Sequence, residues 1–124
     1  MAYSQTINLV TGDTLPELVF TLRDSRSAAP GKTLDENDSS TWEPINITGS
    51  VVRLRLRELG STAVKSTLTC TVIDGINGKA ATNFPSGVLD KAGTFEGELE
   101  ITFDNGGKQT VYDLIKLKVR SDFD

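Results

Sequence analysis

The sequence of 124 residues has no histidine, a single cysteine and a single tryptophan. Without histidine, neither a serine–histidine–aspartate triad nor a histidine metal site can form, and imidazole acid–base chemistry is excluded. One cysteine, Cys70, gives no disulfide framework. No apolar run approaches the roughly 18 residues that span a bilayer, and the first residues lack the basic and apolar regions of a secretory signal. We therefore expect a protein made in a cytoplasm, with no membrane partner.

Length and composition are typical of one globular domain covering residues 1–124. Hydrophobic residues make up 37% of the chain and charged residues 24%, which is unlike a disordered acidic or basic sequence. A domain of this length buries roughly two-thirds of its unfolded surface, which is enough for its own core. The formal net charge of -4 disfavours nucleic acid as a partner, because nucleic-acid binding requires a basic surface.

Charged and apolar residues alternate in three stretches, and the sign of the charge changes between them. Residues 52–57 alternate with arginine, residues 95–101 with glutamate, and residues 115–120 with lysine and arginine. Successive side chains of a β-strand point to opposite faces, so each stretch buries one face and exposes a charged one. The pattern predicts antiparallel sheets with one wet face each.

Turn signals divide the chain into about seven short strands, which favours an all-β, immunoglobulin-like antiparallel β-sandwich without the usual cysteine pair. We expect strands at 3–10, 15–24, 50–58, 63–73, 76–83, 94–104 and 108–121. One short helical turn is expected over 84–93, with Ser86 as its N-cap and Gly93 at its end. Residues 25–45 have no strand or helix period, and we expect a long polar insertion loop that is either disordered or ordered by a partner.

The last two strands allow a register to be predicted. Glu96 and Lys116 both lie on exposed faces, so a three-residue loop at 105–107 would place them opposite each other. The same register places Ile101 opposite Val111 and turns Asp113 inward. A bulge at 112–114 after a two-residue turn is the alternative, and it would bring Tyr112 into the core.

Few residues have the properties of a binding or catalytic site. Arg53, Arg55 and Arg57 could face an acidic partner, or they could form a solvated face that the glutamate stretch neutralises. Trp42 could pin the insertion onto its own domain, or it could anchor the protein in a neighbouring subunit. The acidic run at 35–38 offers oxygen ligands for calcium without the spacing of a calcium loop. Alternation along its strand predicts that Cys70 is buried.

The order of these motifs resembles the immunoglobulin-like N-terminal domain of phage baseplate upper proteins. The resemblance lies in GDTLPELVFTLRD at 12–24, INITG at 45–49 followed by VVRLRLR at 51–57, and AGTFEGELEI at 92–101. It spans almost the whole chain, and the insertion stands where such domains usually have a short turn. Members of the family usually continue into a stalk or fibre, whereas this sequence ends after its last strand.

The resemblance implies a non-enzymatic structural protein of a bacteriophage virion, made in the bacterial host, that works as a tail- or baseplate-type adaptor. Other virion proteins would be its partners, in an assembly with multiple copies and without a cofactor. A capsid decoration protein is the first alternative, and a carbohydrate- or receptor-binding module that uses Trp42 is the second.

Overall fold

The computed structural model describes residues 3–14, 17–85 and 87–123, and almost all of its regular structure is β. Ten strands and one 3-10 helix lie in these residues. The strands are β1 (Tyr3–Val10), β2 (Leu18–Thr21), β3 (Arg23–Ala28), β4 (Trp42–Pro44), β5 (Val51–Glu58), β6 (Val64–Asp74), β7 (Lys79–Thr82), β8 (Gly93–Thr102), β9 (Lys108–Thr110) and β10 (Leu114–Arg120), and the helix is η1 (Ser39–Thr41). No helix among the described residues is long and apolar enough to cross a membrane.

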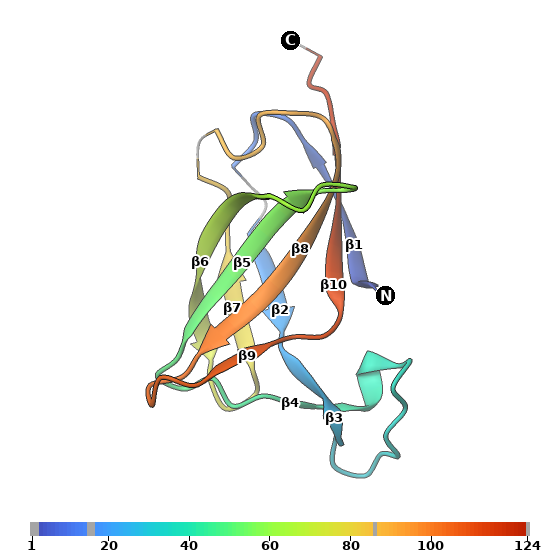
Figure 1. Ribbon diagram of the computed structural model, residues 1–124, viewed down its shortest axis with the longest axis vertical. Coiled ribbons are helices and arrows are strands. Elements are labelled where there is room, and N and C mark those ends of the chain that lie inside the picture. Colours follow the sequence, from blue (N-terminus) through green and yellow to red (C-terminus); the bar gives the residue numbers. More distant parts are fainter. Residues whose placement is uncertain (1–2, 15–16, 86, 124) are drawn as a thin grey trace.

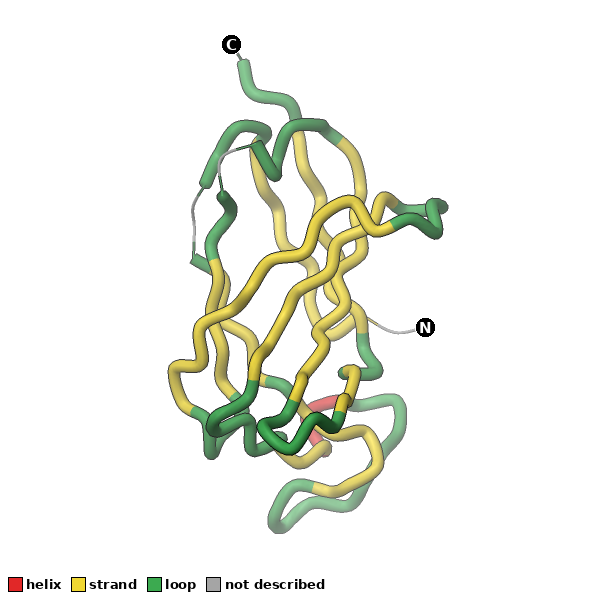
Figure 2. Tube along the Cα trace, turned by 60° about the vertical axis from the view of Figure 1, so that its left-hand side comes forward, coloured by secondary structure: helices red, strands yellow, loops and turns green. Residues whose placement is uncertain are grey.

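One curled sheet forms the body of the domain, as Figures 1 and 2 show. Its strands lie in the order β1-β10-β8-β5-β6-β7-β2, with β9 paired to β8, and the curl brings β7 and β2 behind β5 and β8. The all-β, sandwich-like fold is confirmed. One pairing departs from the antiparallel expectation, because β1 runs parallel to β10. A turn at Thr11 and Gly12 then carries the chain from this border of the sheet towards β2 at the other border.

The core lies inside the curl and is built by the predicted alternation. In β5, Val52, Leu54 and Leu56 are buried while the intervening arginines are partly exposed. The same alternation holds along β8, where the inner position Gly97 lies against Leu54. A Cβ atom on Gly97 would come within 2.9 Å of Leu54 Cδ1, so a larger residue here would force the Leu54 side chain to shift. Cys70 is buried on β6, as the sequence predicted.

Two of the expected strands are interrupted. The strand expected at 15–24 ends at Thr21, and β3 begins two residues later. Between them, the buried Leu22 donates its N–H to the carbonyl of Gly78 (2.8 Å) and accepts a hydrogen bond from the N–H of Ile45 (2.8 Å). Gly78 has a φ of +72° and a backbone so close to Leu22 and Ile45 that no side chain fits, so glycine is required here. The strand expected at 108–121 is interrupted between β9 and β10.

The register of the last hairpin is partly as predicted. Glu96 lies opposite Lys116, as expected, but Ile101 pairs with Gln109 and not with Val111. The loop closes one residue earlier than predicted, because the N–H of Phe103 bonds to the carbonyl of Gly107 and leaves 104–106 as the loop. The register of β9 on β8 and that of β10 on β8 therefore differ by two residues, and the irregular segment 111–113 between β9 and β10 accommodates this difference. Asp113 faces inward at 7% exposure, while Tyr112 stays outside at 61%.

The helical turn expected at 84–93 is wrong for the described part of that segment. Residues 87–89 form a hydrogen-bonded turn that begins with the N–H of Val88 donating to the carbonyl of Pro85, and β8 already starts at Gly93. The proposed N-cap, Ser86, lies outside the described residues. The helical element of the described chain is η1, in the insertion, where the Asp38 side chain accepts a hydrogen bond from the N–H of Ser40.

The insertion contains regular secondary structure, which its sequence pattern did not predict. Residues 23–44, here called the arm, fold into a two-stranded sheet of β3 and β4 with η1 between them. The arm projects from the end of the domain opposite to the C-terminus (Figure 1). The strong local turn formers of this stretch bond to one another, and a search for strand or helix periodicity does not detect such order.

Candidate interaction surfaces

The outward side chains of β5, β8 and β10 form a surface here called the charged half. The register sets Arg53, Arg55 and Arg57 opposite glutamates 100, 98 and 96. Arg55 Nη1 lies 3.3 Å from Glu100 Oε2 and 3.9 Å from Glu98 Oε1, and Arg57 Nη2 lies 3.1 Å from Glu96 Oε1. The arginine and glutamate stretches are therefore neighbours, and they largely neutralise each other within the molecule.

The basic stretch of β10 is only partly compensated by β8. Lys116 lies opposite Glu96, but the next outward residue, Lys118, lies opposite Thr94. Arg120 extends over the ring of Phe123 with 5.4 Å between the guanidinium carbon and the ring centre. Positive charge therefore collects near the border of the sheet, where β10 meets β1.

The outward side chains of the middle of β6, β7 and β2 form a second surface, here called the neutral half. Thr71, Ala81 and Val19 lie in one row across these three strands, with the small Ala81 buried between its exposed neighbours. Thr67 and Thr69 continue the row of threonines along β6. Lysines lie only at the ends of the neutral half, on β6 and β7. This surface is not evident from the sequence, because neutral residues produce no pattern of alternating charge.

Trp42 is placed inside its own chain. Its side chain is 1% exposed, and the indole Nε1 donates to the carbonyl oxygen of Asp35 at 2.9 Å. The Arg23 guanidinium donates to the Trp42 carbonyl at 3.0 Å. Of the two roles considered for Trp42, these contacts fit pinning of the arm onto its own domain, because the side chain is almost fully buried.

A pocket of about 220 Å³ lies at the base of the arm. Its lining includes Gln5, Val19, Thr21, Arg23, Trp42 and Asp113. Burial raises the pKa of the Asp113 carboxyl. The pocket is smaller than the usual 300–1,000 Å³ of small-molecule sites. It brings together Trp42 and Asp113, and for Asp113 the sequence predicted only that the side chain faces inward.

The acidic run at 35–38 serves the turns of the arm. Asp35 Oδ1 accepts a hydrogen bond from the N–H of Asn37 at 2.9 Å. Asp38 Oδ1 accepts two from Ser40, from its hydroxyl (2.7 Å) and its N–H (3.0 Å), and these bonds lower the pKa of Asp38. Within the described residues, no three His, Cys, Asp or Glu side chains are grouped so that they could hold a metal ion.

Cys70 has the properties of a core thiol. It is 7% exposed, and burial raises its pKa to about 11. A thiol with so high a pKa is almost entirely protonated at neutral pH, whereas the thiolate is the nucleophilic form. The described residues therefore offer no activated thiol.

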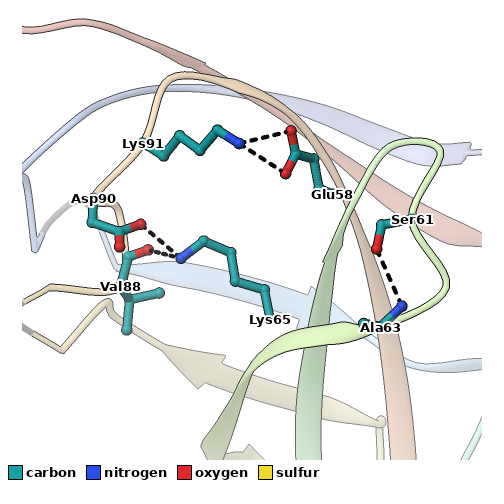
Figure 3. Close-up of polar contacts among 7 residues, drawn as sticks. All are labelled: Glu58, Ser61, Ala63, Lys65, Val88, Asp90 and Lys91. Atoms are coloured by element: carbon teal, nitrogen blue, oxygen red, sulfur yellow. Dashed lines mark hydrogen bonds and ion pairs between the residues drawn. The ribbon is translucent and has the colours of Figure 1, made fainter.

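Lysine contacts fix the end of the domain nearest the C-terminus. Figure 3 shows Lys65 of β6 reaching Asp90 Oδ1 (2.7 Å) and the carbonyl of Val88 (3.2 Å). It also shows Lys91 contacting both carboxylate oxygens of Glu58 at 3.1 Å. The bond from Lys65 lowers the pKa of the Asp90 carboxyl. These exposed contacts hold the loop before β8 against the β5–β6 hairpin.

A scan of protein-family models found no matching family, and a search of curated proteins found no match.

Proposed function

We propose that this protein is a non-enzymatic structural component of a bacteriophage virion, a tail- or baseplate-type adaptor that attaches other virion proteins. The observation that carries the proposal is the order of the three motifs that resemble phage baseplate upper proteins. In this fold, those motifs supply β2, β5 and β8 together with the turns that lead into them. The adaptor would act in multiple copies and without a cofactor.

The arrangement of reactive groups supports a role in attachment. Cys70 is buried and protonated, and the carboxylates of the charged half are engaged by arginines. A glycoside hydrolase needs two carboxyl groups that converge across a cleft, whereas these carboxylates lie side by side along the outward face of β8. The outer surfaces of the domain and its projecting arm remain as the features through which it acts.

Immunogold electron microscopy of virions tests the proposal. An antibody against the purified protein is applied to particles from a lysate of the bacterium that carries the gene. We expect gold at the tail end of the particle. Gold on the head would contradict the adaptor role in favour of capsid decoration, and particles without gold would contradict a virion role altogether.

A further inference from the structure

Strand β1 forms a border of the main sheet with nothing paired to its outer side. Among the described residues, its pairing partner is β10 alone, because β1 stands at the end of the strand order. Gln5 is exposed and lines the pocket at the base of the arm together with Val19 and Thr21 of β2, the strand at the opposite border. Apart from this pocket beside Gln5, the side of β1 that faces away from β10 has no strand paired to it within residues 3–14, 17–85 and 87–123.

The sequence of β1 has little of the usual protection of a border strand. Natural proteins shield long borders with charged residues, proline, bulges or very short strands. The eight residues YSQTINLV include no charge, no proline and no glycine, and the one irregularity is a shift of the register with β10 between Tyr3 and Gln5, at the start of the strand. In contrast, β2 at the other border has four residues. From Gln5 to Val10 the strand is uncharged and continuously paired with β10, so its other side is a template for pairing with another chain.

The surroundings of β1 define what such a strand must look like. Ile7 is only partly buried and packs at the margin of the core, while Thr6 and Asn8 are exposed on the outer face. The added strand must supply an apolar residue beside Ile7 and uncharged or acidic residues on the outer face, because Lys118 and Arg120 lie one strand further in. The β1 sequence itself satisfies this requirement.

We propose that β1 pairs with β1 of a second copy of this chain, antiparallel and across a two-fold axis. Centring the pair on Ile7 sets Ile7 against its own counterpart and Thr6 opposite Asn8 of the other copy. No charged residue then faces another across the junction. The inference goes beyond the proposed function and does not depend on where the protein works.

The basic residues of β10 do not prevent this pairing. In the paired state, the two β10 strands are separated by three strand spacings of about 4.8 Å, roughly 14 Å in all. The Debye length at physiological ionic strength is about 8 Å, so repulsion between the two basic rows is largely screened. The association is therefore expected to change little with salt above physiological concentration.

Sedimentation equilibrium of the full chain, from micromolar to millimolar concentration, is the test. We expect a concentration-dependent dimer of the wild-type protein. The double variant Thr6→Lys, Asn8→Lys places like charges opposite each other twice, and it should weaken the association about tenfold or more. The double variant Thr6→Glu, Asn8→Glu should do the same, and an equimolar mixture of the two should associate again.

Two matched controls carry the same kind of change elsewhere. Thr71→Lys and Ile73→Lys both lie at exposed positions of the inner strand β6, and both should retain the dimer. Circular dichroism establishes that each variant is folded. The proposal is overturned by a wild-type protein that stays monomeric at every concentration, by lysine and glutamate variants that dimerise as the wild type does, or by a mixture that does not associate.

A crosslink gives an independent measurement. Directly opposed residues of antiparallel strands have Cα atoms about 4.5–5.5 Å apart, within the range that a disulfide spans. Ile7→Cys should therefore form a disulfide-linked dimer under mild oxidation, while the buried thiol of Cys70 stays unreactive. Failure to crosslink at concentrations where the variant sediments as a dimer would contradict pairing centred on Ile7.

Discussion

The charged half and the neutral half belong to the same sheet and cover the same core, yet they are built from different residues. On the charged half, arginines of β5 face glutamates of β8 across a shared register. On the neutral half, threonine, alanine and valine lie in rows without charge. The difference shows that the fold depends on the buried apolar residue at every second position of a strand. The outward residues between them can be charged or neutral without changing the fold. Charges that satisfy one another are poorly suited to recruit a partner.

The largest effect is expected from the core that both halves share. Leu54 on β5 and Leu68 on β6 pair directly and are buried, so replacing either with alanine leaves a cavity under one half or the other. We expect each change to lower the free energy of unfolding by about 2–5 kcal/mol, measured by denaturant titration. Leu59→Ala, at a half-exposed position, is the control and should have little effect. Two separate transitions in either variant would show that the halves fold independently.

Cys70 on β6 lies opposite Val52 on β5, where the two halves meet. The pH dependence of stability reports how deeply its thiol is buried there. Its pKa is about 11 in the folded protein and near 9.0 when unperturbed, so the unfolded chain loses the thiol proton first as the pH rises. The folded state is thus favoured fully below pH 9, and this advantage is lost progressively between pH 9 and 11. A shift of this size corresponds to about 2–3 kcal/mol. Denaturant titrations of wild type and Cys70→Ala should converge or cross over this range, and a constant difference would mean that the thiol is accessible.

Introducing one lysine into each half sharpens the comparison. Glu98→Lys places a cation beside Arg55 in the charged half, and we expect a loss of stability of about 1 kcal/mol. Thr71→Lys in the neutral half meets no charge opposite it and should change stability by no more than about 0.5 kcal/mol. Thermal melts at low and high salt distinguish the two, because only the first change should be screened. Equal losses would mean that the surfaces differ in composition alone.

The smallest effect concerns a single ion pair of the charged half. Arg57 Nη2 and Glu96 Oε1 are 3.1 Å apart, and the arginine side chain is 43% exposed. A double-mutant cycle with alanine at both positions should give a coupling free energy of about 0.2–1 kcal/mol, decreasing with salt. A coupling of zero at low salt would show that the register alone keeps these residues opposite each other.

The strands of both halves could be predicted from the sequence, but only the charged half gave an indication of which strands pair. Alternation of charge identified β5, β8 and β10 and even the pairing of Glu96 with Lys116. The break at 111–113 was harder to place, because two loop lengths satisfy the same alternation and only the inward Asp113 distinguishes them. Local composition gave no indication that β1 would pair in parallel with β10, because that pairing joins the two ends of the chain.

The arm was the least predictable region. Its order comes from hydrogen bonds between turn residues and from one buried indole, and neither produces a periodic signal. The sequence alone is compatible with two opposite roles for Trp42, and the hydrogen bond from its indole to Asp35 fits pinning of the arm. For the arginines, adjacency of β5 and β8 decides in favour of mutual neutralisation at Arg55 and Arg57.

Residue-resolved amide hydrogen exchange by NMR, at low and high protein concentration, tests the central claim most directly. If the charged half is satisfied within the molecule and β1 is the open border, raising the concentration should protect amides of β1 and leave those of β5 and β8 unchanged. New protection confined to β5 and β8, with β1 exchanging as before, would contradict the account.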